Sequence, residues 1–166
     1  MSDLLDLCTS SETWNVGPYA EVRVGDHVTR YVRRGTGPSV VLVGTDANAS
    51  PVVLPLITKL APNHRLIVPQ TPVTDDLANW LRGFVEGLGL SGIALISGDG
   101  PAAAATELAT IDEFTIRKLV VLPKRSVQAS SNGKHSSDRI LRVDAAWSPD
   151  DAVTRIASFI ADEAAA

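Results

Sequence analysis

The sequence predicts a single α/β domain with a mostly parallel sheet, helices on both faces of that sheet and an antiparallel hairpin at its N-terminal side. Three observations lead to this prediction. Continuous apolar runs, typical of strands buried on both faces, alternate with stretches of helical spacing. Residues 19–33 instead alternate apolar and charged side chains around a turn. The 166 residues, 45% of them hydrophobic, suit one domain with a substantial core.

The hairpin is the first expected element. Two strands, residues 19–25 and 27–33, flank a turn at Gly25 and Asp26. Valines alternate with charged neighbours in the first of these strands. One face of the hairpin should therefore be exposed.

Buried strands and helices follow in alternation. The strands are expected at residues 39–44, 64–69, 93–97, 117–122 and 139–144. The helices are expected at residues 51–61, 74–87 and 102–110 and from residue 148 to the C-terminal region. Thr74 is the predicted N-cap of the second helix, and Trp80 and Phe84 fall on its apolar stripe.

We expect residues 1–166 to form one domain, because neither an internal repeat nor a linker divides them. Residues 1–15 are expected to be a flexible N-terminal extension. Residues 124–138, rich in serine with asparagine and glycine, are predicted to be a polar surface loop.

Composition excludes several classes of function. A net charge of −4 gives no electrostatic footprint for a nucleic acid partner. No apolar run is long enough to span a membrane and no basic leader precedes one, which favours a soluble cytoplasmic protein with no membrane partner. Cys8 is the single cysteine, so neither an intrachain disulfide nor a cysteine zinc cluster is expected. The abundance of alanine, valine, arginine and aspartate favours a bacterial source.

The most informative segment is residues 93–103, an apolar run that ends on Ser-Gly-Asp-Gly-Pro and passes into an alanine-rich stretch. This pattern predicts a strand, a sharp turn and a helix. In open α/β sheets such a turn raises one side chain above the carboxyl edge, where sites are found. That side chain is Asp99. A phosphate loop is disfavoured because Gly98 and Gly100 lack a third glycine and a following lysine, so no nucleotide and no other cofactor is expected.

Several fragments, in this order, resemble the α/β-hydrolase superfamily from about Tyr19 to Ile160. Residues 35–45, Gly-Thr-Gly-Pro-Ser-Val-Val-Leu-Val-Gly-Thr, are similar to the lead into the strand before the family's oxyanion loop. Residues 96–100, Ile-Ser-Gly-Asp-Gly, are similar to its nucleophile elbow, in which small residues flank the nucleophile. The resemblance implies an α/β-hydrolase-like fold.

The resemblance also implies roles for site residues. Asp99 occupies the nucleophile position, and an aspartate nucleophile is used by branches such as haloalkane dehalogenases and epoxide hydrolases, where it forms an ester intermediate. Gly98 supplies a small neighbour. Thr45, Asp46, Gly98 and the N–H of Gly100 would contact the substrate or its developing oxyanion.

The sequence departs from the family at four positions. Gln70 stands where the family usually has aspartate, and Pro101 where it usually has glycine. The family's Gly-His pair is replaced by Ala145 and Ala146, so the expected base is absent. His135, in the polar loop, is the one remaining histidine that could reach the carboxyl edge.

The segment between the last two strands is too short for the family's lid. A lidless site would be open, or completed by another chain, so a homodimer is expected, with Trp147 as a candidate contact. No metal site is predicted.

Two hypotheses remain. In the first, a lidless enzyme with an incomplete triad acts on a small carbonyl, ester or epoxide substrate through Asp99, by hydrolysis or by a base-catalysed lyase or cyclase step. In the alternative, the chain is a noncatalytic pseudoenzyme that serves as a binding or assembly partner. Asp99 would then be a turn residue that caps the following helix, Thr45 and Asp46 would be loop residues, and His135 would be solvated.

Overall fold

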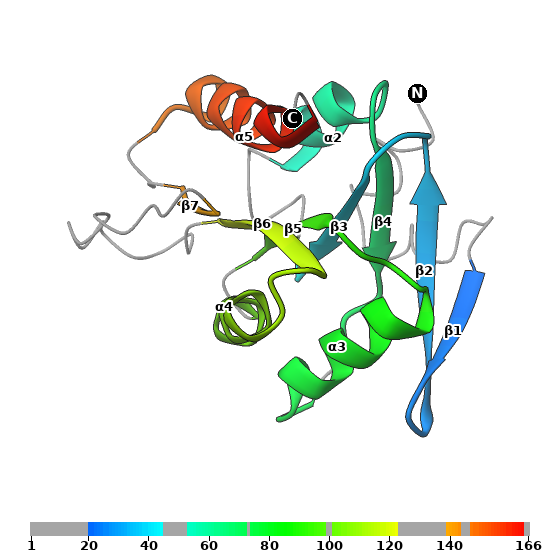
Figure 1. Ribbon diagram of the computed structural model, residues 1–166. Helices are drawn as coiled ribbons and strands as arrows, with labels where there is room; N and C mark the ends of the chain where they lie inside the picture. The colour runs from blue at the N-terminus through cyan, green and yellow to red at the C-terminus, as the bar shows by residue number, and fades with distance from the viewer. Residues whose placement is uncertain are drawn as a thin grey trace.

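A seven-stranded sheet with the strand order β1-β2-β4-β3-β5-β6-β7 forms the centre of the molecule. The computed structural model describes residues 20–44, 53–72, 74–98, 101–122, 139–143 and 147–164 (Figure 1). The strands are β1 (Ala20–Val24), β2 (His27–Arg34), β3 (Ser39–Val43), β4 (Arg65–Pro69), β5 (Ile93–Ser97), β6 (Ile116–Val121) and β7 (Ile140–Arg142).

The sheet is parallel from β4 to β7, and the hairpin β1–β2 joins it antiparallel through β4. The predicted fold class is therefore confirmed, with an N-terminal antiparallel hairpin on a mostly parallel sheet. Within the described residues no helix is long and apolar enough to cross a membrane.

Helices cover both faces of the sheet. They are α2 (Val53–Leu60), α3 (Leu77–Gly87), α4 (Ala102–Ile111) and α5 (Pro149–Ala164). Figure 1 shows α2 and α5 on one face and α3 and α4 on the other. The expected strands and helices are all present, with ends that differ by a few residues. The predictions for residues 1–15 and 124–138 concern segments outside the described residues.

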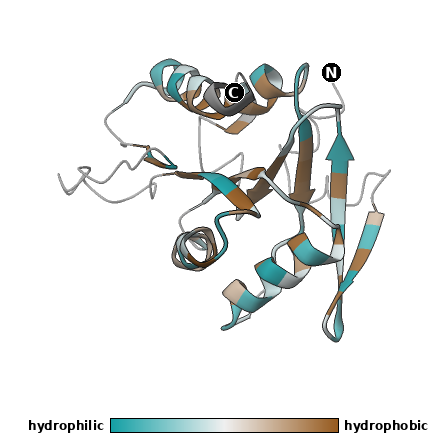
Figure 2. Cartoon of the chain, in the orientation of Figure 1, coloured by the Kyte–Doolittle hydropathy of each residue, from teal (hydrophilic) through white to brown (hydrophobic). Residues whose placement is uncertain are grey.

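Two apolar cores follow from the two-residue period of the strands. In β3, Val40 and Leu42 belong to the core beneath α2 and α5, whereas Val41 and Val43 belong to the core beneath α3 and α4. All four side chains are at most 1% exposed. Figure 2 shows the hydrophobic central strands between helices that carry both hydrophobic and hydrophilic residues.

The hairpin is attached to α3 by buried side chains. The Trp80 indole N–H donates to Thr29 Oγ1 at 3.0 Å, and Tyr31 packs edge-on against Phe84. Trp80 and Phe84 are 6% and 0% exposed, which confirms their predicted place in the core. A Cβ at Gly83 would lie 2.7 Å from Val24 Cγ1, so glycine permits this close approach.

The predicted N-cap of α3 is wrong. Asp76, and not Thr74, is the N-cap, and its carboxylate accepts the Asn79 main-chain N–H at 3.4 Å. The Thr74 hydroxyl instead accepts the Asp76 N–H at 3.2 Å. The two side chains act in succession, because Thr74 organises the turn that leads to the cap.

Polar contacts also fix the connection from α4 to β6. Arg139 Nη2 donates to the Ala109 and Ile116 carbonyl oxygens at 3.0 and 2.6 Å. The Asp112 carboxylate accepts the Thr115 hydroxyl at 2.7 Å and the Thr115 main-chain N–H at 3.1 Å. These hydrogen bonds lower the pKa of Asp112, with the Thr115 hydroxyl as the largest cause.

Candidate active site at the carboxyl edge of the sheet

Three neighbouring strands end together at the carboxyl edge. Val43 of β3 is paired with Ser97 of β5, and Ser97 is paired with Val121 of β6. The main-chain bonds continue past the strand ends, because the Gly98 N–H donates to the Val43 carbonyl at 2.9 Å and the Leu122 N–H donates to the Ser97 carbonyl at 2.9 Å. The end of β5 is therefore held on both sides.

Pro101, at the start of α4, contacts the end of β3. A Cβ built on Gly44 would lie 2.4 Å from Pro101 Cδ and 2.5 Å from its Cγ. The sequence has proline where the family resemblance leads one to expect glycine, and the structure shows how the space is found. Gly44 has no side chain, and this leaves room for the Pro101 ring. The start of α4 therefore still approaches the sheet closely.

Thr71 is a third contact at this edge. Its hydroxyl accepts the Gly44 N–H at 3.1 Å, which ties the segment after β4 to the end of β3. The sequence alone assigns no role to Thr71. No local signal identifies its partner, which lies 27 residues away.

Ser97 is the hydroxyl residue within the predicted elbow, but its burial excludes it as a nucleophile. It is 0% exposed, and its Oγ donates to the Gly98 carbonyl at 2.8 Å. An attacking hydroxyl must reach substrate. Ser97 therefore acts as the small residue that the strand end requires.

The N-terminus of α4 lies at the same edge. Its N-cap position is Pro101, whose ring has no hydrogen-bond acceptor for the first N–H groups of the helix. The positive end of a helix dipole favours a negative charge nearby. Asp99 precedes this cap by two positions in the sequence.

Of the predicted site residues, the structure describes Gly98 alone, which follows β5 and is buried. The others lie outside the described residues and their predicted roles stay predictions: Thr45, Asp46, Asp99, Gly100 and His135. Ala145 and Ala146 also lie outside them.

The described histidines are not placed beside β5 at this edge. His27 is exposed at the hairpin turn, and strands β4 and β3 separate its strand from β5. His64 is buried just before β4, at the opposite edge of the parallel strands. Within the described part of the chain, no three histidine, cysteine or acidic side chains gather as a metal site.

Solved structures resemble this arrangement. A protein named as a lipase from Acinetobacter baumannii AYE superposes with a TM-score of 0.55 at 22% identity, over 79% of this chain and 48% of its own. A haloalkane dehalogenase loop variant from Bradyrhizobium elkanii superposes with a TM-score of 0.51 at 21% identity, over 63% and 39% of the two chains. An ancestral haloalkane dehalogenase gives a TM-score of 0.51 at 24% identity, over 62% and 41%.

These likenesses establish a shared fold. The chain spans less than half of the length of each of these three structures. No family model and no curated protein matches the sequence.

Proposed function

The chain has the α/β-hydrolase fold, and on that premise we propose that it acts through Asp99 on a small carbonyl, ester or epoxide substrate at the carboxyl edge of the sheet. The observation that carries this proposal is the anchoring of both ends of one short connection. Gly98 is bonded to Val43, and Pro101 contacts Gly44. Only Asp99 and Gly100 lie between these two anchored residues.

The proposed nucleophile falls in a link of two residues between a strand end and a helix start. In this fold, such a link carries the nucleophile. We place the Asp99 carboxylate there, near the positive end of α4, where the helix dipole stabilises the ionised form that attacks.

With an epoxide, the first step forms an ester. A carboxylate oxygen of Asp99 bonds to a ring carbon, the ring C–O bond breaks, and the released oxygen takes up a proton from water. The N–H of Gly100 and the segment of Thr45 and Asp46 are proposed to stabilise the oxyanion when the ester is hydrolysed.

The second step needs a base to activate water, and the chain has Ala145 and Ala146 where the family has its Gly-His pair. His135 is the proposed substitute. Without a base that activates water, the ester at Asp99 would accumulate. Alternatively, Asp99 would itself serve as the base in a lyase or cyclase step, which needs no hydrolytic water.

A noncatalytic binding protein is the second candidate, and two observations favour it. The position of the family's base holds Ala146. The Gly44 N–H at this edge already donates to the Thr71 hydroxyl, so it is not directed at a substrate oxyanion. A binding protein would retain the anchored edge without any chemistry at Asp99.

Intact-mass spectrometry and turnover assays separate these functions. The protein is incubated with styrene oxide, p-nitrophenyl acetate, a small lactone and 1-bromobutane. The proposed enzyme gives either turnover or a stoichiometric adduct that peptide mapping assigns to Asp99, and Asp99→Asn abolishes it.

His135→Gln separates the two steps, because it should stop turnover while the adduct persists. Turnover or labelling at wild-type level in Asp99→Asn would refute the assignment of Asp99. The absence of both products across the panel would favour the binding protein.

A further inference from the structure

The outer edge of β1 is the end of the sheet furthest from β7, and no strand of the described residues pairs with it (Figure 1). On its inner side β1 is paired with β2, in an antiparallel register that runs from Ala20 opposite Tyr31 to Val24 opposite His27. An edge strand presents main-chain N–H and C=O groups that can pair with a further strand. This edge is therefore a candidate interaction surface.

Glu21 and Arg23 direct their main-chain groups towards this outer edge. The hairpin turns on two residues, of which Gly25 is the first and has φ of +60°, so Val24 and His27 are the closing bonded pair. Bonded and non-bonded pairs then alternate along an antiparallel hairpin. Arg23 and Glu21 consequently fall in non-bonded pairs, and their N–H and C=O groups point away from β2.

The main chain of Arg30 agrees with this alternation. Arg30 lies opposite Glu21, and its carbonyl accepts the Gln70 N–H at 2.8 Å, on the side of β4. Its carbonyl therefore points away from β1, as a non-bonded pair requires.

The order Glu-Val-Arg at residues 21–23 is self-complementary in an antiparallel strand pair. When two copies of β1 are paired with Val22 opposite Val22, Glu21 of each copy lies directly opposite Arg23 of the other. Pairing centred on Glu21 or on Arg23 would instead place two like charges opposite each other. Because opposite charges stabilise a strand pair and like charges destabilise it, the sequence favours the register centred on Val22.

Both charged side chains are exposed and keep polar atoms for a further contact. Glu21 Oε1 accepts Arg30 Nε at 3.2 Å, with the two side chains 50% and 47% exposed. Arg23 Nε donates to the Gly25 carbonyl at 3.3 Å. Neither bond uses Glu21 Oε2 or the Nη groups of Arg23, so these atoms can form an ion pair across the edge.

Val22 supplies an apolar contact on the other face of β1. It is half-buried and packs against the core beneath α3. A Cβ on Gly87 would lie 3.0 Å from Val22 Cγ2, so α3 lies close over this strand. In the register centred on Val22, the two valines form a non-bonded pair, in which side chains come closest. Each valine therefore covers the exposed part of the other.

We propose that β1 pairs antiparallel with β1 of a second copy of this chain, about a two-fold axis at Val22, so that the two sheets become continuous. Glu21 of each copy exchanges main-chain hydrogen bonds with Arg23 of the other and forms an ion pair with it. The contact is smaller than a standard interface, so the dimer is weak and reversible. It is separate from the carboxyl edge and does not depend on the role of Asp99.

Sedimentation velocity of the full chain tests the dimer between about 1 μM and about 1 mM protein. A monomer is expected in dilute solution and a dimer at the highest concentrations. The dimer should be weaker in about 1 M than in about 0.1 M sodium chloride, because salt screens exposed ion pairs. A monomer at every concentration would overturn the proposal.

Charge exchange tests the register. Arg23→Glu places like charges opposite each other at both contacts and should weaken dimerisation at least about tenfold. Adding Glu21→Arg to this variant restores opposite charges in the same register and should recover most of the affinity. Arg33→Glu makes the same charge change at an exposed position of β2 and is the matched control, which should dimerise as wild type does.

Unchanged dimerisation in Arg23→Glu, or an equal loss in Arg33→Glu, would contradict the proposed pairing. Failure of the double variant to recover would also contradict it, provided that circular dichroism shows a folded protein.

Hydrogen exchange of the wild-type protein locates the contact without any substitution. The Glu21 and Arg23 amides should exchange rapidly in dilute protein and become protected at about 1 mM. The Val22 amide belongs to a bonded pair with β2 and should be protected at both concentrations. Protection that rises with concentration near Trp147 and spares Glu21 and Arg23 would place the interface elsewhere and overturn the proposal.

Discussion

Substitution of Gly44 by alanine measures how tightly α4 is held against the end of β3. Gly44 has φ of +60°, and its added Cβ would lie 2.4 Å from Pro101 Cδ. The left-handed backbone costs a non-glycine residue roughly 1–2 kcal/mol. Forced overpacking adds about 1–3 kcal/mol. Gly44→Ala should therefore lower the free energy of unfolding by about 2–5 kcal/mol.

Gly89 is a matched control for the backbone contribution. Its φ of +64° is nearly the same, and a Cβ there meets nothing within 4 Å. Gly89→Ala should cost only about 1–2 kcal/mol. Urea unfolding gives both values, read from the midpoints where the m-value is unchanged.

A double-mutant cycle isolates the contact itself. Pro101→Ala removes the Cγ and Cδ atoms that would clash, so Gly44→Ala should cost about 1–3 kcal/mol less in that background. Equal losses for Gly44→Ala and Gly89→Ala, or strict additivity in the cycle, would refute the close approach of Pro101 to Gly44. The anchored two-residue link would then lose one of its two anchors.

Three further predictions concern the hairpin, β7 and the α4–β6 connection. Thr29→Val leaves the buried Trp80 indole N–H unpaired and should lower the free energy of unfolding in urea by about 1–3 kcal/mol. Thr29→Ser keeps the hydroxyl and should retain most of the wild-type stability. Arg139→Met removes two hydrogen bonds to main-chain carbonyls and should cost about 1–3 kcal/mol; a loss below the error of unfolding would contradict them. Thr115→Val should raise the pKa of Asp112 toward its ordinary value near 3.8 in an NMR titration. Because the folded-state pKa is lowered, this hydrogen bonding stabilises the protein above pH 3.8 and the stabilisation is lost as the pH falls further, so the variant should differ from wild type least in strong acid.

The parallel strands could be predicted because their signal is local. Residues 40–43 and 93–96 are continuous apolar runs, each followed by glycine within two residues, and each lies in a buried strand of the structure. The α3 cap shows where local signals conflict. Thr74 and Asp76 are both good cap residues, and only the course of the chain determines which one lies at the helix start.

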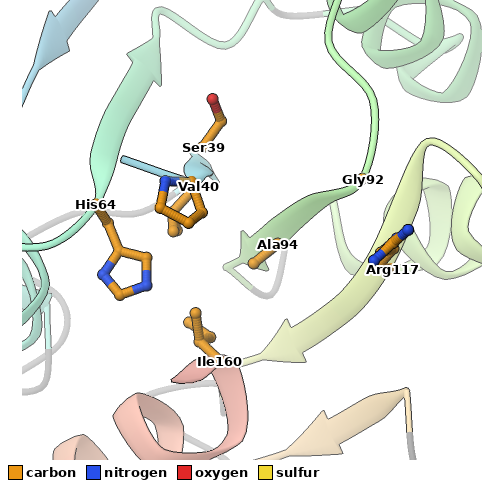
Figure 3. Close-up of a pocket in the computed structure, with 8 residues that line it drawn as sticks. Ser39, Val40, His64, Gly92, Ala94, Arg117 and Ile160 are labelled. Carbon is orange, nitrogen blue, oxygen red and sulfur yellow. The ribbon is translucent and has the colours of Figure 1, made fainter. Parts of the chain in front are cut away.

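The contacts that build the candidate site could not be predicted in the same way. Thr71 and Gly44 are brought together by the order of β4 beside β3, and Pro101 meets Gly44 through the crossover from β5 to α4. Neither pair has a sequence periodicity that connects it. The cavity lined by Ser39, His64 and Ile160 (Figure 3) likewise depends on where α5 lies over the strand starts, which helical spacing does not specify.

The anchoring of the carboxyl edge bears on how a substitution at Asp99 should be interpreted. The described bonds around its position use main-chain atoms, the Thr71 hydroxyl and the Pro101 ring. Asp99→Asn is nearly isosteric, so its urea midpoint should match that of wild type. Loss of the ester adduct at unchanged stability would then be assigned to the chemistry of this carboxylate, because the strand end and the helix start would still be held in place.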